Sequence, residues 1–190
     1  MSLDPSRAGQ LLLTKGAVPA PLHPRENVRL ARLRDYEILD SEPEAVFNDL
    51  IALASYVTET PLGAISFVDR DRQWFKATHG FADQQTDRSI AFCAHAILET
   101  GPAFIVPDAA KDERFSGNPL VTGPPHIRFY AGIPMLTPDG LPLGSFCVMD
   151  RTARELRPQQ IEMLQHIARI AMDVVDSERH AVVLEKHIIF

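Results

Sequence analysis

Two apolar runs joined by a tight turn, over residues 127–150, constrain the fold of this chain more than any other stretch. Between the runs lies Thr137-Pro138-Asp139-Gly140. Proline fixes φ and glycine tolerates a positive φ, so this turn favours a reversal of the chain. Both runs are apolar at consecutive positions, as in strands that are covered on both faces. The sequence therefore predicts a central hairpin in a sheet with two buried faces.

Hydrophobic periodicity and turn residues predict the elements before this hairpin. Helices are expected over 25–39 and 43–58, the second preceded by a capping box of Ser41 and Glu44. A hairpin of strands over 61–69 and 73–79, a short helix over 89–98 and a strand over 104–106 should follow. Residues 109–126 are rich in proline, glycine and charge, which is typical of a long functional loop. Residues 1–24 contain four prolines and predict a flexible arm, which leaves a domain core over 25–157.

Residues 158–190 predict one long helix, because they contain no glycine and no proline after Pro158. A second apolar stripe beside its main seam indicates two packing partners. At about 1.5 Å per residue the helix is longer than a small domain is wide, so a second chain should cover its far half. We expect a parallel homodimer, with the helix continuing from its apolar end into an output domain. The seam has heptad spacing, with Ser177 as its weak position, and comprises Met163, Ile167, Ile170, Val174, Ala181, Leu184 and Ile188.

Composition excludes several classes of protein. The net charge of −6 gives no basic field, so we expect no nucleic-acid partner. No apolar run reaches the ~18 residues of a membrane span, so we expect no membrane partner either. Cys93 and Cys147 are 54 positions apart, which argues against a zinc ribbon or a disulfide framework and favours a reducing, cytoplasmic location.

The expected ligand pocket lies between the strands and the segments that should cover them. We place it between Trp74 and Tyr130 on the sheet and two covering segments, residues 92–95 and 114–118, because a mostly apolar cavity with a few polar anchors is the usual small-molecule site. The arginines could grip an anion, although ion pairs with nearby Asp108, Asp112 and Glu113 explain them equally well. The candidate ligand-binding residues are Trp74, Lys76, Phe92, Cys93, His95, Arg114, Phe115, Asn118, Arg128 and Tyr130.

Catalytic motifs are absent from the sequence: it has no glycine-rich phosphate loop, no Gly-x-Ser-x-Gly elbow and no His-Glu-x-x-His pair. We therefore expect no enzymatic activity from this chain. Cys93 and His95 are two positions apart on a predicted helix, so they do not face one metal ion, and no metal site is predicted. Both cysteines are expected to be small buried hydrophobes.

Six segments resemble the GAF domain family, in the subgroup that precedes histidine-kinase or diguanylate-cyclase modules in bacterial signalling proteins. They are ENVRLARLRDYEILDSEPE, VDRDRQWFK, FCAHAI, DAAKDERFSGNPLV, RFYAGIP and GSFCVMDR. The resemblance implies an α+β, PAS-related fold: a central antiparallel sheet of five or six strands, terminal helices on one face, and a pocket under loops and short helices on the other.

The same resemblance bears on cofactors. Bilin-binding GAF domains attach their chromophore through a cysteine adjacent to a histidine, whereas this chain has Cys93-Ala94-His95. The Asn-Lys-Phe-Asp-Glu signature of cyclic-nucleotide GAF domains is absent. Bilin, haem and cyclic nucleotide are therefore unsupported, and the ligand stays unidentified.

These observations favour a cytoplasmic sensory module that binds a small ligand and relays the signal through a dimeric C-terminal helix. Any catalysis would belong to an output domain such as a histidine kinase or a diguanylate cyclase. Two alternatives stay open: a redox enzyme of the free methionine-sulfoxide reductase type, for which two separated cysteines are a poor match, and a purely structural dimerisation domain.

Overall fold

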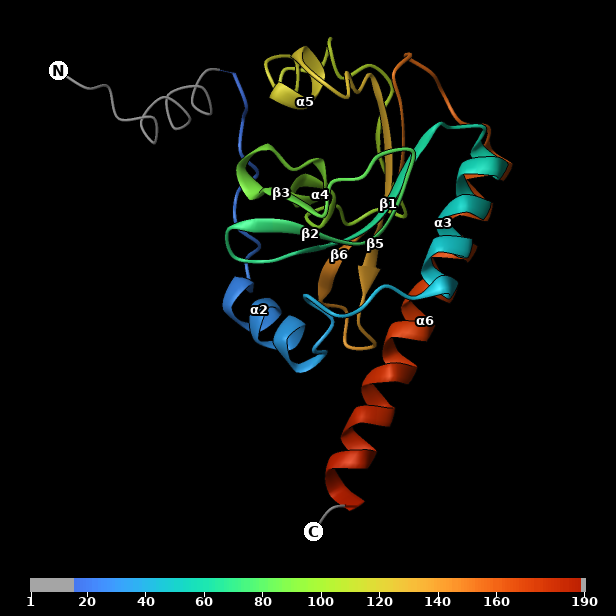
Figure 1. Cartoon of the computed structure of the whole chain (residues 1–190). Helices are drawn as coiled ribbons and strands as arrows, with labels where there is room; N and C mark the ends of the chain where they lie inside the picture. Colours follow the sequence, from blue (N-terminus) through green and yellow to red (C-terminus); the bar gives the residue numbers. More distant parts are fainter. Residues whose placement is uncertain (1–15, 189–190) are drawn as a thin grey trace, which may run out of the picture.

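A six-stranded antiparallel sheet forms the centre of the molecule (Figure 1). The structure is a computed structural model that describes residues 16–188, with side chains through Arg179. The strand order is β3-β2-β1-β6-β5-β4. This arrangement, with helices on the sheet, confirms the predicted α+β architecture. The strands are β1 (Leu62–Val68), β2 (Arg72–His79), β3 (Gln85–Asp87), β4 (Phe104–Val106), β5 (Phe129–Leu136) and β6 (Pro142–Asp150).

The predicted central hairpin is formed by β5 and β6. Their register runs from Phe129 opposite Asp150 to Leu136 opposite Pro142. Gly140 has a φ of +81°, and the Thr137 hydroxyl accepts a hydrogen bond from the Leu141 amide at 2.9 Å. Every residue of β6 is buried. The hairpin is therefore covered on both faces, as its unbroken apolar pattern requires.

Three helices contribute to the core on one face of the sheet. They are α2 (Glu26–Asp35), α3 (Ala45–Thr58) and α6 (Pro158–Ile188). Phe47 and Ile51 of α3 pack with Leu164 and Ala171 of α6 in one cluster of buried side chains. Figure 1 shows α3 beside the first half of α6, while the second half of α6 extends beyond the sheet. We call this side the helix face.

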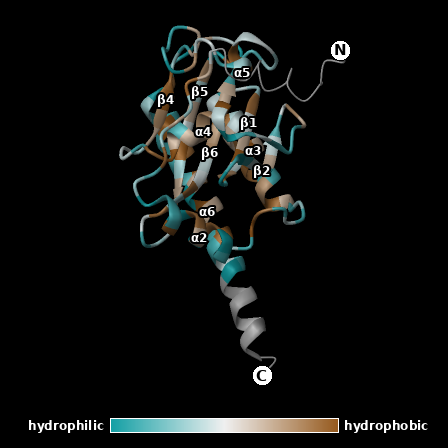
Figure 2. Cartoon of the chain, turned by 90° about the vertical axis from the view of Figure 1, so that its left-hand side faces the viewer, coloured by the Kyte–Doolittle hydropathy of each residue, from teal (hydrophilic) through white to brown (hydrophobic). Residues whose placement is uncertain are grey.

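Short elements and loops cover the opposite side, which we call the loop face. The elements are the 3₁₀ helix Arg88–Ile90, α4 (Phe92–Ala96) and α5 (Pro119–Thr122). They pack a second, separate cluster of buried side chains against the strands. Figure 2 shows the hydrophilic colouring mainly along the outer loops, with hydrophobic colouring on the strands between. In the described part of the chain, no helix combines the length and apolarity that a membrane crossing requires.

Three local predictions were wrong. The first helix ends at Asp35, because Glu37 and Asp40 adopt positive φ angles of 52° and 58°, which a helix cannot contain. Ser41 is not a helix cap: its hydroxyl donates to the Ile38 carbonyl at 2.7 Å, and Glu44 occupies the N-cap position of α3. The sequence analysis missed β3, since a strand of three polar residues carries no hydrophobic pattern.

The predicted seam of α6 is divided in the structure. Ile167 is buried in the core of the domain, whereas Met163 and Ile170 are 44% and 49% exposed. Val174 is partly buried against the same core. The reason is that α6 packs against the sheet, and this contact buries Ile167 together with the second apolar stripe of the helix. The side chains of Ala181, Leu184 and Ile188 lie outside the described residues.

The expectation of a flexible N-terminal arm stays a prediction, because residues 1–15 lie outside the described residues. Further along, the Val18 carbonyl is 3.0 Å from His95 Nε2, and Ala20 packs against the loop-face cluster. The end of the predicted arm thus lies against the domain.

Candidate functional site

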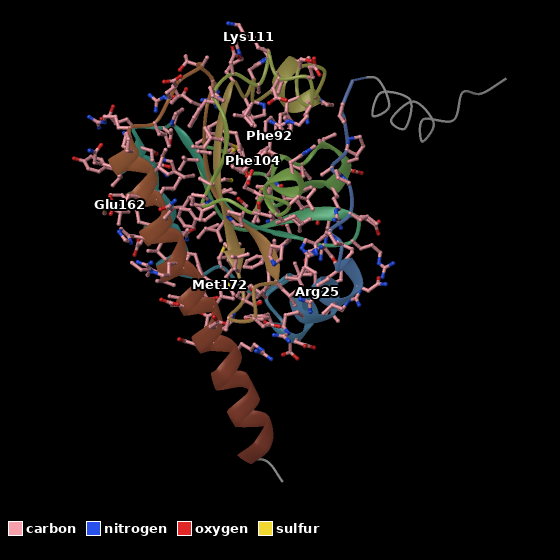
Figure 3. The ribbon with its side chains drawn as sticks, turned by 180° about the vertical axis from the view of Figure 1, so that it is seen from behind. Arg25, Phe92, Phe104, Lys111, Glu162 and Met172 are labelled. Atoms are coloured by element: carbon pink, nitrogen blue, oxygen red, sulfur yellow. The ribbon has the colours of Figure 1, made fainter. Side chains whose placement is uncertain are left out.

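A stack of aromatic rings fills the volume expected to be the pocket. Phe92 is stacked on Phe115, with ring centroids 4.1 Å apart. The Tyr130 ring is also stacked on Phe92, with ring centroids 5.2 Å apart. His95 meets the edge of Phe115 at 4.8 Å, and Phe104 contacts both Phe115 and Tyr130. Figure 3 shows Phe92 and Phe104 on the loop face, with Met172 of α6 across the sheet. The structure therefore brings Phe92, His95, Phe115 and Tyr130 together, but as packed aromatic side chains.

A small cavity of about 50 Å³ adjoins this stack. Ligand sites for drug-sized molecules are usually ~300 Å³ or larger, so the cavity as it stands suits only a small molecule. Its wall is mainly apolar, and it includes side chains from β2, α4 and the end of the long loop. The lining residues are Leu62, Gln73, Phe75, Phe81, Asp83, Thr86, Phe92, Cys93, Leu120, Pro125, Ile127, Tyr130, Cys147 and Met149.

Two buried polar atoms of this wall lack partners. Gln73 is 5% exposed, and its Oε1 atom makes no hydrogen bond. The hydroxyl of Thr86, which faces Gln73 in the β2–β3 register, is also without a hydrogen bond. Buried polar groups are normally paired, and leaving one unpaired costs about 1–3 kcal/mol. An unpaired acceptor and an unpaired hydroxyl beside one cavity mark it as a place where a polar molecule would gain hydrogen bonds.

Trp74 and Lys76 do not belong to this site. Successive side chains of a strand point to opposite faces, so Gln73 and Phe75 reach the cavity while Trp74 joins the helix-face core. Lys76 Nζ bonds Ser41 Oγ at 2.8 Å and also pairs with the Glu44 carboxylate. The expected pocket between Trp74 and Tyr130 was wrong for this reason: the sheet itself separates the two rings.

The arginines that could have bound an anion are paired with carboxylates of the same loop. Arg114 binds Asp112 through two hydrogen bonds of 2.9 and 2.6 Å, and Arg128 binds Asp108 in the same way at 2.7 and 2.8 Å. The hydrogen bonds from these arginines hold the pKa of each aspartate below its usual value. The planar guanidinium of Arg114 also lies 5.0 Å from the Phe104 ring. Both arginines therefore form the structural ion pairs that the sequence offered as the alternative to an anion site.

Asn118 serves the local backbone of the loop. Its side chain accepts a hydrogen bond from the Leu120 amide, which caps α5, and donates one to the Ile90 carbonyl, each at 2.9 Å. The residue therefore joins the long loop to the 3₁₀ helix and does not face the cavity.

Two thiols, a phenol and a hydroxyl form a buried polar group at the inner wall of the cavity. Cys93 Sγ lies 3.1 Å from Tyr130 Oη and 3.8 Å from Cys147 Sγ, and Tyr130 Oη lies 3.2 Å from Ser145 Oγ. Burial acts to raise the pKa of Cys93, but the side chains of Cys147, Ser66 and Tyr130 around its sulfur stabilise the thiolate, outweigh burial and lower that pKa. The pKa of Cys147 is raised, because its hydrogen bond with the Cys93 sulfur favours the protonated thiol and because the thiol is buried.

His95 is hydrogen-bonded to the segment before α2. Its Nε2 faces the Val18 carbonyl, which can only accept, so Nε2 carries the proton. Burial lowers the pKa of His95 and favours the neutral ring. Within residues 16–188, no group of three histidine, cysteine, aspartate or glutamate side chains could hold a metal ion.

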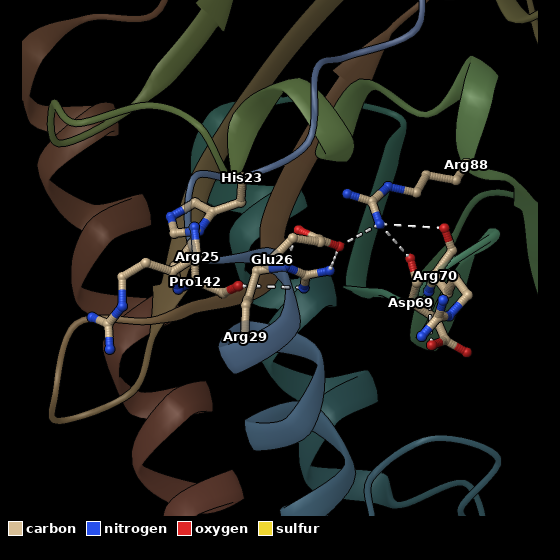
Figure 4. A network of polar contacts seen from close by, with 8 residues as sticks. All are labelled: His23, Arg25, Glu26, Arg29, Asp69, Arg70, Arg88 and Pro142. Carbon is tan, nitrogen blue, oxygen red and sulfur yellow. Dashed lines mark hydrogen bonds and ion pairs between the residues drawn. The ribbon is translucent and has the colours of Figure 1, made fainter.

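A second polar network was missed by the sequence analysis (Figure 4). Glu26 accepts hydrogen bonds from Arg29 at 2.7 and 3.0 Å and from Arg88 at 2.6 Å. Arg88 also donates to the backbone carbonyls of Asp69 and Arg70. The network joins α2 to the β1–β2 turn and to the 3₁₀ helix that leads into α4. Glu26 and Arg29 have the local i, i+3 spacing of a helical ion pair, but no local motif marks the link to Arg88, which is 62 positions from Glu26.

The cavity residues Gln73, Phe75 and Thr86 were likewise absent from the predicted site. A usable signal existed for two of them: Gln73 and Phe75 are separated by two positions, so they share a strand face. Thr86 could not have been found, since it lies on the unpredicted β3.

Comparison with known proteins gives one curated relative with high identity. The chain is 45% identical over 148 residues to "Cyclic di-GMP phosphodiesterase PA2567" of Pseudomonas aeruginosa. The match covers 77% of this chain and 25% of the relative. The chain thus spans about a quarter of the length of that protein. The expectation that the protein is not an enzyme is contradicted by this relative, whose name is that of an enzyme.

Solved structures share the fold at low identity. The blue-light absorbing form of the Thermosynechococcus elongatus PixJ GAF domain is 18% identical, with a TM-score of 0.57, over 84% of this chain and 94% of that one. The free methionine-R-sulfoxide reductase of Neisseria meningitidis is 16% identical, with a TM-score of 0.56, over 87% of this chain and 99% of that one. At such identities the likeness shows the fold alone.

The family assignment rests on a match across most of the chain. The model of the GAF domain matches residues 9–174, which include the six strands of the described structure and about the first half of α6. The predicted resemblance is confirmed. This chain belongs to the GAF domain family.

Proposed function

We propose that this chain is the sensory GAF region of a cytoplasmic protein that hydrolyses cyclic di-GMP, and that a small polar molecule in the loop-face cavity regulates that hydrolysis. The 45% identity to a cyclic di-GMP phosphodiesterase supports the link to this reaction. The three quarters of that relative outside the match leave room for a separate catalytic region. In this proposal a domain core over 25–157 binds the ligand and the helix from residue 158 relays its effect.

The unpaired atoms Gln73 Oε1 and Thr86 Oγ1 carry the ligand proposal. A bound molecule with an N–H or O–H donor would pair with Gln73 Oε1, and the Thr86 hydroxyl can donate or accept. The exposed Asp83 carboxylate lies on the same wall and accepts hydrogen bonds as well. A small donor-rich molecule with an apolar side therefore fits the wall best. A larger ligand would require Phe81 and Leu120, both only partly buried, to move outward.

Native mass spectrometry of the chain purified from its own host tests this proposal. Wild-type protein should carry a small molecule. The control Gln84→Leu, at an exposed position between β2 and β3, should carry it as well. Gln73→Leu should lose it, since the leucine offers no acceptor. In the longer protein, Gln73→Leu should also abolish the effect of that molecule on cyclic di-GMP hydrolysis. Wild-type protein that carries nothing, together with hydrolysis that Gln73→Leu leaves unchanged, would reject the proposal.

We also propose that the domain acts as a homodimer through α3 and α6. Met163 and Ile170 are one heptad apart on α6 and nearly half exposed. On the adjacent α3, Val46 and Leu53 are also seven residues apart and exposed, and Tyr56 is 81% exposed. Large apolar side chains repeated on two packed helices form the kind of surface that a second copy covers. Parallel pairing would bring the two distal helix ends together.

Sedimentation of a double variant tests the dimer. Met163→Glu with Ile170→Glu should give monomer at micromolar concentration, because burying two unpaired charges costs several kcal/mol. Gln159→Glu, an exposed change in the first turn of α6, adds charge outside the apolar surface and should stay dimeric. An unchanged mass in the double variant would remove α6 from the interface.

A further inference from the structure

The two cysteines of the chain, far apart in sequence, meet at the centre of the loop face. Cys93 comes from α4 and Cys147 from β6, and their sulfurs are 3.8 Å apart. Both are free thiols and both are about 1% exposed. A disulfide requires the sulfurs to approach to about 2 Å, so the two sulfurs must move closer by about 1.8 Å.

We propose that Cys93 and Cys147 form a reversible disulfide when a small peroxide enters the cavity, so that this face of the domain responds to oxidants. The observation behind it is that one cavity is lined by both thiols. A single water needs about 10–15 Å³, so the volume of about 50 Å³ admits a molecule of two heavy atoms. The wall extends from the exposed Asp83 to the buried cysteines, which gives an oxidant a route inward.

The chemistry assigns different parts to the two sulfurs. Cys93 Sγ contacts Tyr130 Oη and the Cys147 thiol, both of which can donate a hydrogen bond to a Cys93 thiolate, so it is the sulfur on which a thiolate is stabilised. Its thiolate attacks one peroxide oxygen, the O–O bond breaks, and Cys93 becomes a sulfenic acid as hydroxide leaves and takes a proton to become water. The Cys147 sulfur then attacks the sulfenic sulfur, the S–O bond breaks, and a second water leaves with the Cys147 proton. Two electrons pass from the two thiols to the peroxide.

The disulfide would tie α4 to β6 across the cavity wall. The disulfide would replace the hydrogen bond between Cys93 and Tyr130 and hold Cys93 and Cys147 in fixed positions in the cavity wall. This regulation uses the same cavity as the ligand proposed above, but it requires the thiols and not Gln73. A failure of one proposal therefore leaves the other standing.

Thiol counting on the reduced chain tests the pair. After hydrogen peroxide treatment, denaturation and N-ethylmaleimide labelling, wild-type protein should take up no maleimide, and a non-reducing digest should yield one linked peptide pair containing Cys93 and Cys147. Dithiothreitol should restore two labelled cysteines. The chain should remain of one mass on a non-reducing gel, because the bond lies within one molecule.

Single variants test the order of the two steps. Cys147→Ser should stop at a sulfenic acid on Cys93 that dimedone captures, whereas Cys93→Ser should leave Cys147 unmodified at the same peroxide dose. Tyr130→Phe keeps both thiols but removes a hydrogen bond to the thiolate, and it should slow oxidation about tenfold. Circular dichroism confirms that each variant is folded. Wild-type protein that keeps two free thiols at a peroxide dose that oxidises glutathione, or that forms only linked dimers, would overturn the proposal.

Discussion

The two faces of the sheet differ in how their interiors are filled. Each face has a buried side-chain atom without a hydrogen bond, Ser55 Oγ of α3 on the helix face and Gln73 Oε1 on the loop face. On the helix face, Phe47, Ile51 and Ala171 are at most 1% exposed in one continuous apolar core. On the loop face, aromatic stacking leaves a cavity of about 50 Å³, two buried atoms without hydrogen bonds, and a pair of reduced thiols. The comparison indicates that the helix face supplies stability, while the loop face places unpaired polar atoms and thiols beside a cavity that a small molecule can enter.

The largest expected loss of stability comes from a substitution in the core of the helix face. Phe47→Ala should lower the free energy of unfolding by about 3–5 kcal/mol, because it opens a hole in a core where the ring is fully buried. Phe81→Ala, at the partly buried cavity wall, should lower it by about 1–2 kcal/mol, since that ring is already near solvent. Urea denaturation measures both. Equal losses would show that the two faces contribute alike.

The next effect concerns Glu26, which links α2 to the loop face. Glu26→Ala leaves Arg29, which is fully buried, without its carboxylate, and should cost about 3 kcal/mol. Burial acts to raise the pKa of Glu26, but its hydrogen bonds to Arg29 and Arg88 outweigh this and lower it from 4.5 to about 2. The ionised pair therefore stabilises the fold above pH 4.5, and this stability is lost as pH falls toward 2.

Acid denaturation of both proteins checks the Glu26 prediction. Wild-type stability should fall below pH 4.5 more steeply than that of Glu26→Ala, which has no carboxylate to protonate. Glu26→Gln, which keeps a hydrogen-bond acceptor, should lie between the two at neutral pH. Parallel acid profiles for wild type and Glu26→Ala would assign the loss to another group.

The sequence predicted the elements with long apolar patterns and missed those set by distant contacts. The β5–β6 hairpin and α6 were found because apolar runs and a Pro-Asp-Gly turn are local signals. Ile167 was assigned to the dimer seam because heptad spacing cannot show which stripe the domain itself buries. Trp74 was placed beside Tyr130 because the predicted strands had no assigned faces.

The candidate site was predicted less well than the fold, for a physical reason. Aromatic residues of α4 and the long loop lie together in the structure, and their close packing depends on ring orientations that no sequence pattern encodes. The cavity depends on Thr86 of β3, a strand without an apolar signal. The approach of Cys93 to Cys147 follows from the packing of α4 on β6, a contact between residues 54 positions apart.

In contrast to the helix face, one substitution on the loop face should raise the stability of the chain. Gln73→Leu removes a buried oxygen that has no hydrogen-bond partner, so the unfolding free energy should rise by about 1 kcal/mol in the ligand-free chain. Thr137→Val on the central turn is the matched contrast: its hydroxyl is bonded to the Leu141 amide and to Asp139, and its loss should destabilise. A loss of stability in Gln73→Leu would mean that Gln73 is already satisfied.

The smallest expected effect lies where α6 passes the α2–α3 connection. Burial, followed by a hydrogen bond and the negative charge of Glu44, raises the pKa of Glu178 from 4.5 to about 7. Glu44 is held ionised by that hydrogen bond and by Lys76, so the proton of the pair resides on Glu178. Tyr36 and Arg179 stack nearby, and the Tyr36 hydroxyl bonds Asp176. A raised carboxyl pKa stabilises the fold fully below pH 4.5 and loses that contribution as pH rises through 7.

The stability of wild-type protein should therefore fall between pH 4.5 and 7, by less than about 1 kcal/mol because the pair is partly solvated. Glu178→Gln copies the protonated carboxyl and should flatten this interval, leaving the Glu26-dependent loss below pH 4.5 in place. Glu162→Gln, at an exposed position on the same helix, should keep the wild-type profile. Urea midpoints at pH 4.5, 5.5, 6.5 and 7.5 measure the slope. An equal slope in wild type and Glu178→Gln would show that the titrating group is not Glu178.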